Sequence, residues 1–79
     1  MSIRASDLAV VTVETHLGAV YVFPDMPREA LRNVVDSDGW AQAGRLVLVN
    51  ISAAVLTMEA RLVKAVSYDG KVQWPCSPA

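Results

Sequence analysis

The feature that most constrains this chain is a series of short apolar runs between residues 45 and 74, which carry almost no charge. Residues 46–51 are apolar on both faces of a would-be strand, and further runs follow at 53–58 and 62–66. Runs of this length that are rich in valine, leucine and isoleucine are typical of strands buried on both sides. Because a chain of 79 residues can hardly cover both faces of its strands, the pattern predicts partners.

The composition of the chain favours the same conclusion. Hydrophobic residues make up 53% of the chain and charged residues only 19%, below the roughly 25% of ordinary soluble domains. So low a charge favours self-association or docking onto a larger assembly. The formal net charge is −1 and no basic stripe is present, so the electrostatic attraction that drives nucleic-acid binding is missing.

Neither a membrane segment nor a disulfide is expected. The uncharged stretch at residues 46–58 is shorter than the roughly 20 apolar residues that span a bilayer, and the N-terminal residues do not have the pattern of a signal peptide. The single cysteine, Cys76, cannot form an internal disulfide. We therefore expect synthesis inside the cell and a fold that is stabilised by packing alone.

The chain is predicted to form one domain, residues 1–79, with an N-terminal arm at 1–6, a β-rich core at 7–74 and a tail at 75–79. The core is expected to begin with a hairpin, whose strands lie at residues 8–15 and 19–23. A turn containing Gly18 joins these strands.

A helix is predicted to follow the second strand. Pro24 is expected to end that strand, because proline cannot donate to a sheet ladder. Asp25 is then expected to cap a helix at about residues 26–35, with Pro27 in its first turn. Apolar residues share one face of this helix, which should lie against the sheet (Met26, Ala30, Leu31, Val34, Val35). Residues 40–44 are expected to form a loop.

The dipeptide Asp69-Gly70 predicts a final hairpin. A two-residue loop would pair Tyr68 with Lys71 and Val66 with Gln73, whereas a three-residue loop would pair Ser67 with Lys71 and Val66 with Val72. The second register is preferred because it places valine opposite valine. The resulting order, β-β-α-β-β-β-β, predicts a mainly β (α+β) fold. It would be a small antiparallel barrel or sandwich with one short helix after the second strand.

Few residues in the sequence could carry chemistry. His16 lies in a tight turn without a positioned partner for general base catalysis, and Cys76 lies in a proline-bounded tail without a neighbouring base. Asp36 and Asp38 resemble only the opening of a calcium loop, and helix termination explains them better. The sequence thus predicts no enzyme and no catalytic, cofactor-binding or metal-binding residue.

Four residues are predicted to belong to an interface. Trp40 lies in a glycine-flanked segment and Trp74 precedes the proline-containing tail, and large rings in such places often anchor a partner. For both rings the alternative, that each covers the core of its own chain, stays open. Leu46 and Leu48 complete the set, because their run has no polar face.

Residues 45–50 and 58–66 resemble the latter half of an SH3-like or Sm-like barrel, in which an apolar hairpin leads through a short turn into a closing strand. The resemblance implies a small SH3-like or Sm-like β-barrel. The chain departs from the Sm family in having its helix after the second strand and in lacking the glycine-centred RNA-binding motif. RNA binding is therefore not carried over.

Residues 21–27, 48–56 and 68–70 are similar in style to small virion proteins of tailed phages. Such proteins include capsid decoration, or cement, subunits, which bind a shell of major capsid protein at many equivalent positions. The resemblance implies a virion subunit that is made in the host cytoplasm and binds the major capsid protein or copies of itself, with affinity raised by multivalency. The alternative function is a cytoplasmic, ring-forming Sm-like or SH3-like adaptor that binds a peptide or RNA.

Overall fold

The computed structural model of the protein describes residues 4–37 and 39–75. Its elements, in chain order, are η1 (Ala5–Asp7), β1 (Leu8–Thr15), β2 (Val20–Pro27), α1 (Arg28–Ser37), α2 (Gly39–Ala43), β3 (Arg45–Val49), β4 (Val55–Glu59), η2 (Ala60–Leu62), β5 (Val63–Tyr68) and β6 (Lys71–Trp74).

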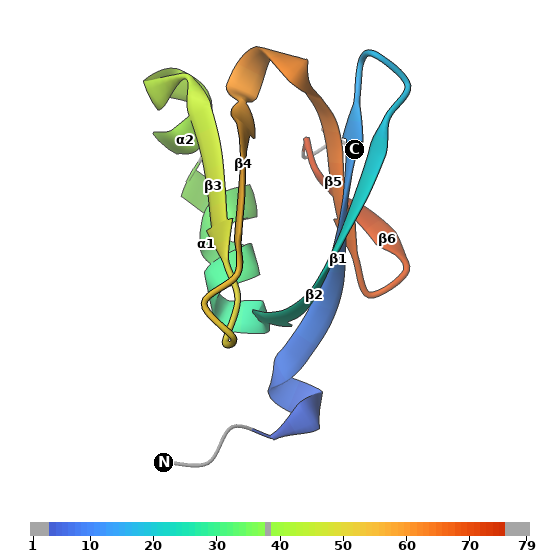
Figure 1. Ribbon diagram of the computed structural model, residues 1–79, viewed down its shortest axis with the longest axis vertical. Helices are drawn as coiled ribbons and strands as arrows, with labels where there is room; N and C mark the ends of the chain where they lie inside the picture. Colours follow the sequence, from blue (N-terminus) through green and yellow to red (C-terminus); the bar gives the residue numbers. More distant parts are fainter. Residues whose placement is uncertain (1–3, 38, 76–79) are drawn as a thin grey trace.

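The strands form two antiparallel sheets that face each other. One sheet has four strands in the order β2-β1-β5-β6, and the other is the two-stranded hairpin β3–β4. Both helices lie on the side of the β3–β4 hairpin (Figure 1), so within residues 4–37 and 39–75 no helix covers the opposite face of the four-stranded sheet. The predicted fold class is confirmed: the domain is a small, mainly β sandwich with a short helix after the second strand.

Alternation along the strands builds the core between these two layers. Val11 and Val13 of β1 point inward and are fully buried, as are Leu46 and Leu48 of β3. Strand side chains point to opposite faces in turn, so each inward residue has outward neighbours. The buried apolar cluster joins both sheets and helix α1 (Ala9, Val11, Val13, Met26, Leu31, Leu46, Leu48, Val63, Val66).

Strand β2 runs past the point where the sequence predicted its end. It continues through Pro24 to Pro27, and the pairing with β1 shifts between Ala9 and Val11, which is a β-bulge. Proline is tolerated here because β2 is an edge strand and the bulge already interrupts the ladder. Asp25 has a φ of 60° in this bulge, so the prediction that it caps the helix is wrong.

Helix α1 begins at Arg28, two residues after the predicted start, and ends at Ser37. Leu31 and Val35 are its buried side chains, as the apolar spacing predicted, and they pack it against the sheet. The segment after Gly39 was predicted as a loop and is instead the short helix α2. The indole of Trp40 fixes this turn of helix to α1, which is a contact that local sequence does not encode.

The last hairpin has the shorter loop of the two that the sequence allowed. Tyr68 pairs with Lys71, and the central residues Asp69 and Gly70 have φ values of 54° and 76°. Two consecutive positive φ values define a type I′ turn, whose twist matches that of the flanking strands. The preferred three-residue loop is therefore wrong, and the irregularity occurs instead between Val66 and Ser67.

The described part of the predicted N-terminal arm is fixed to the domain. The backbone N–H of Arg4 donates to Asp7 Oδ2 at 3.3 Å, and the guanidinium of Arg28 donates to the carbonyl of Ser6. The remainder of the arm and the tail beyond Pro75 lie outside the described residues.

Candidate interaction surface

The residues that could carry chemistry are not brought together. His16 is exposed in the β1–β2 turn, where its backbone N–H donates to the carbonyl of Leu62 at 3.0 Å. Over residues 4–37 and 39–75 no group of three histidine, cysteine, aspartate or glutamate residues could hold a metal ion, and no pocket is present. Asp38 and Cys76 lie outside these ranges.

The two tryptophans, which are 34 residues apart in sequence, meet in space. The ring centroids of Trp40 and Trp74 are 4.6 Å apart, with an angle of 57° between the planes. Trp40 Nε1 donates to the carbonyl of Val34 at 2.8 Å, and both rings are half-buried against the core. The pair thus joins α2 to β6 and packs against the core. An interface role for the exposed part of the two rings stays a prediction.

Leu46 and Leu48 are not available to a partner. Their exposed fractions are 0% and 1%, because both point into the core between the sheets. Their assignment to an interface is therefore wrong. The register shows which residues of this run face solvent instead: Val47 lies opposite Thr57 and Val49 lies opposite Val55.

These outward residues define the hairpin face (Val47, Val49, Val55, Thr57), and all four are exposed. Strand β4 has β3 on one side, and no strand of the described chain pairs with its other side. Arg45 lies opposite Glu59 at one end of this face. The hairpin thus presents an apolar surface beside an open strand edge.

The four-stranded sheet presents a second apolar surface, here named the valine face (Val10, Thr12, Val20, Val22, Ser67, Val72). One row of it crosses all four strands, because Val22 pairs with Thr12, Thr12 with Ser67, and Ser67 with Val72. Val22 and Val72, at the two ends of this row, are 65% and 63% exposed.

A charged pair lies at one end of the valine face. Lys64 Nζ of β5 is 3.9 Å from Glu14 Oε1 of β1, and both side chains are about half exposed. Val20 lies opposite Glu14 in the neighbouring strand. A partner that covers the valine face must therefore satisfy one positive and one negative charge on adjacent strands.

The turn between β3 and β4 is fastened to β2 by Asn50, which is 8% exposed. Its Nδ2 donates to the carbonyl of Pro24 at 3.0 Å, while its Oδ1 accepts from the N–H groups of Ser52 and Ala54 at 2.9 and 3.0 Å. The N–H of Ile51 also donates to the carbonyl of Asp25, at 3.2 Å. These bonds hold one end of the hairpin face rigidly against the larger sheet.

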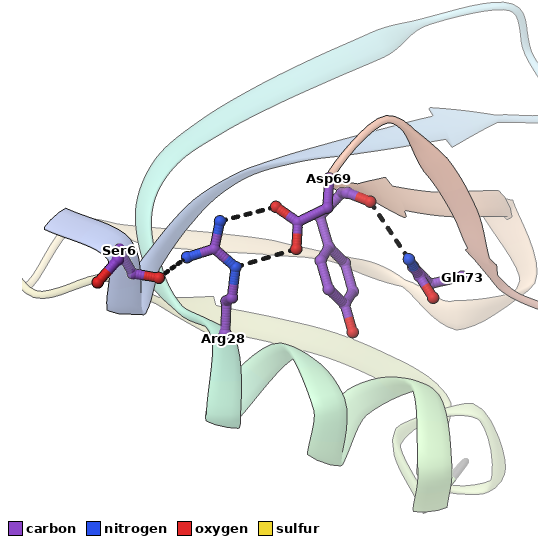
Figure 2. Close-up of polar contacts among 5 residues, drawn as sticks. Ser6, Arg28, Asp69 and Gln73 are labelled. Carbon is purple, nitrogen blue, oxygen red and sulfur yellow. Dashed lines mark hydrogen bonds and ion pairs between the residues drawn. The ribbon is translucent and has the colours of Figure 1, made fainter.

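The turn between β5 and β6 is fastened to helix α1 by Arg28 (Figure 2). The guanidinium makes two hydrogen bonds with the Asp69 carboxylate, at 2.9 and 2.8 Å, and also binds the carbonyl of Ser6. Hydrogen bonding to Arg28 lowers the pKa of Asp69, and hydrogen bonding to Asp69 raises the pKa of Arg28. Partial burial raises the pKa of the neighbouring Tyr68.

Sequence reasoning missed the residues of the valine face, although a signal for them was present. The alternation at residues 8–15 predicts a strand, but it does not by itself identify Val10, Val20 and Val22 as an outward surface. In the first strand Val10 alternates with Val11 and Val13, and in the second strand Val20 and Val22 alternate with Tyr21 and Phe23, so both strands have two apolar faces. Which face lay inward could be known only once helix α1 and the β3–β4 hairpin were placed.

Comparison of the chain with protein-family models, with curated proteins and with solved structures finds no match. Among the helices of the described residues, none has both the length and the apolar character needed to cross a membrane.

Proposed function

We infer that the protein is a non-enzymatic structural subunit that binds other protein surfaces through apolar contacts of its strands. The observation that carries this proposal is the hairpin face, where Val47, Val49 and Val55 point outward next to an open edge of β4. Soluble proteins usually blunt such edges with lysine, proline or a covering segment. Residues 55–58 have neither lysine nor proline, so the edge and its valines suit a protein partner.

The more specific form of the proposal is a capsid decoration subunit. It rests on the resemblance of residues 21–27, 48–56 and 68–70 to small virion proteins of tailed phages. Small size, low charge and two apolar faces that are exposed in the described part of the chain support it, because a decoration subunit must bind a large shell at many equivalent positions. The partner would be the major capsid protein, and the protein would reside in the virion.

An adaptor that binds RNA is less well supported. Single-stranded nucleic acids are held by aromatic rings that stack on bases and by basic groups along the backbone. The valine face and the hairpin face instead carry valine, threonine and serine. We therefore rank protein binding first.

The test uses particles purified from cells that produce the chain, analysed by quantitative mass spectrometry. We expect the chain at a fixed ratio to the main shell protein, with little loss in near-molar sodium chloride. Val47→Lys combined with Val55→Lys should release it, since removal of one central apolar contact weakens binding roughly thirtyfold. Leu17→Lys, at an exposed apolar residue in the β1–β2 turn, is the matched control and should stay bound.

Two results would overturn the proposed function. The chain could be absent from particles, or salt could release it while the two lysine substitutions have no effect. Salt-sensitive binding would indicate an electrostatic contact and would favour the adaptor.

A further inference from the structure

We propose that the valine face is a self-association surface, on which a second copy of this chain packs face to face about a two-fold axis. The inference deepens the proposed function, on which it rests, by naming one partner and the surface that binds it. The axis would run parallel to the strands, between β1 and β5 of the four-stranded sheet. Strand β1 of one copy then lies over β5 of the other, and β2 lies over β6.

The row of residues that crosses the sheet has the same order of apolar and hydroxyl side chains in both directions. This symmetry favours a second copy of the chain as the partner. In strand order the row is Val22, Thr12, Ser67, Val72. Rotation about the proposed axis places Val22 of one copy on Val72 of the other, and Thr12 on Ser67. Valine thus meets valine at both ends and hydroxyl meets hydroxyl in the middle, which is the self-complementarity that a two-fold interface requires.

The charged pair fits the same axis. Glu14 lies on β1 and Lys64 on β5, the two strands on either side of the axis. Glu14 pairs with Ala65, and Lys64, the neighbour of Ala65, reaches to 3.9 Å from Glu14, so the two charges lie close to the same height along the strands. The rotation therefore brings Glu14 of one copy close to Lys64 of the other, twice per dimer. Opposite charges face each other at both positions. The other two-fold axis that packs the faces together lies in the plane of the interface, along the row and perpendicular to the strands, and it would carry both charges to the opposite end of the partner's strands.

The size of the face sets the expected affinity. Strands spaced about 4.8 Å apart and up to eight residues long give four strands a footprint of roughly 400–500 Å² per copy. The total for two copies, roughly 800–1,000 Å², lies at the lower limit of specific protein interfaces. We therefore expect a dissociation constant in the micromolar to millimolar range, which many copies on one shell would strengthen through multivalency.

The first experiment is sedimentation velocity on the chain alone, over concentrations from micromolar to near-millimolar. The unmodified chain should form dimers as concentration rises. Val22→Lys and Val72→Lys should each weaken dimerisation by about tenfold or more. The milder Val22→Thr, which keeps the β-branched shape at an exposed position, should weaken it less. Val47→Lys on the hairpin face and Leu17→Lys in the turn should leave it unchanged.

The second experiment exploits the charged pair through two single variants, Glu14→Lys and Lys64→Glu. Each variant alone places like charges at both proposed contacts and should dimerise poorly at low salt. In an equimolar mixture, the positive face of one variant meets the negative face of the other, and dimers should return. Because each chain still has like charges within itself, a purely structural role for the pair cannot produce rescue on mixing.

The outcomes separate this inference from the proposed function. Three results would contradict the proposal that the chain associates through the valine face. They are a monomer at every concentration, a mixture of the two charge variants that dimerises no better than its components, and a dimer sensitive to Val47→Lys but not to Val22→Lys. Loss of self-association with retained, valine-dependent binding to particles would leave the proposed function standing. A dimer that forms as expected while the chain is absent from particles would retain the self-association surface and overturn the decoration role.

Discussion

The turns that close the β3–β4 and β5–β6 hairpins are both fastened to the same short segment, residues 24–28, by different chemistry. The first turn uses the neutral, buried amide of Asn50, which makes three hydrogen bonds through its side chain. The second uses a partly exposed ion pair between Asp69 and Arg28. The segment that links β2 to α1 thus connects both hairpins to the rest of the domain.

The two turns differ in how much a polar contact contributes to stability, because one contact is buried and the other is exposed. When one partner of a buried hydrogen bond is removed, the remaining polar group has neither that partner nor free access to water, which costs stability. An exposed ion pair is screened by solvent and contributes little. We therefore expect the Asn50 turn to control stability at all pH values and the Asp69 pair to contribute modestly and only above acidic pH.

The largest effect is expected for Asn50→Ala. The substitution leaves the carbonyl of Pro24 and the N–H groups of Ser52 and Ala54 without their partner, so the free energy of unfolding should fall by about 3 kcal/mol. Urea denaturation measures the change. Asn33→Ala, at an exposed position of α1, is the matched control and should cost nothing. Equal stability of the two variants would contradict the central role of the first turn.

A smaller effect is expected for Gly70→Ala. Gly70 has a φ of 76°, and a side chain in this left-handed region costs about 1–2 kcal/mol although no atom lies within 4 Å of the added Cβ. Gly39→Ala is the matched control, since its Cβ also meets nothing within 4 Å but its φ is not positive. Thermal unfolding should separate the two variants, and a Gly70→Ala variant as stable as the unmodified chain would argue against the type I′ turn.

The smallest effect is expected for the Asp69–Arg28 pair, and it should depend on pH. The pKa of Asp69 is lowered in the folded state, so its contribution to stability is complete above the ordinary aspartate pKa, near 3.9, and is lost as pH falls through the lowered value. Asp69→Asn keeps a residue that tolerates positive φ and removes only the charge. The difference in melting temperature between this variant and the unmodified chain should therefore vanish in strong acid.

The control for the pH experiment is Glu59→Gln, which removes the more exposed pair with Arg61. Glu59 and Arg61 are only two residues apart and are more exposed than Asp69 and Arg28. We therefore expect this pair to contribute less to the free energy of unfolding at every pH. If Glu59→Gln and Asp69→Asn gave the same pH profile, the connection from Asp69 to helix α1 would have no measurable effect on stability.

Much of the sandwich could be predicted because its signals are local. The alternation at residues 8–15 predicted strand β1 with its observed bounds, and Asp69-Gly70 predicted a hairpin. Apolar spacing predicted the buried side chains of α1. Each signal depends on backbone preferences or periodicity within a few residues. The candidate interface was predicted less well, since Leu46 and Leu48 proved to be core.

What only the tertiary structure decided depends on residues that are distant in the chain. Strand β2 passes through Pro24 because it lies at the edge of the sheet, and Asn50, 26 residues later, binds the carbonyl of Pro24. Trp40 lies in a helix whose contacts reach Val34 and Trp74. The sequence determined that several strands have two apolar faces. Which face is buried depends on where the opposing layer packs, because burial is a property of the assembled layers and not of any single strand.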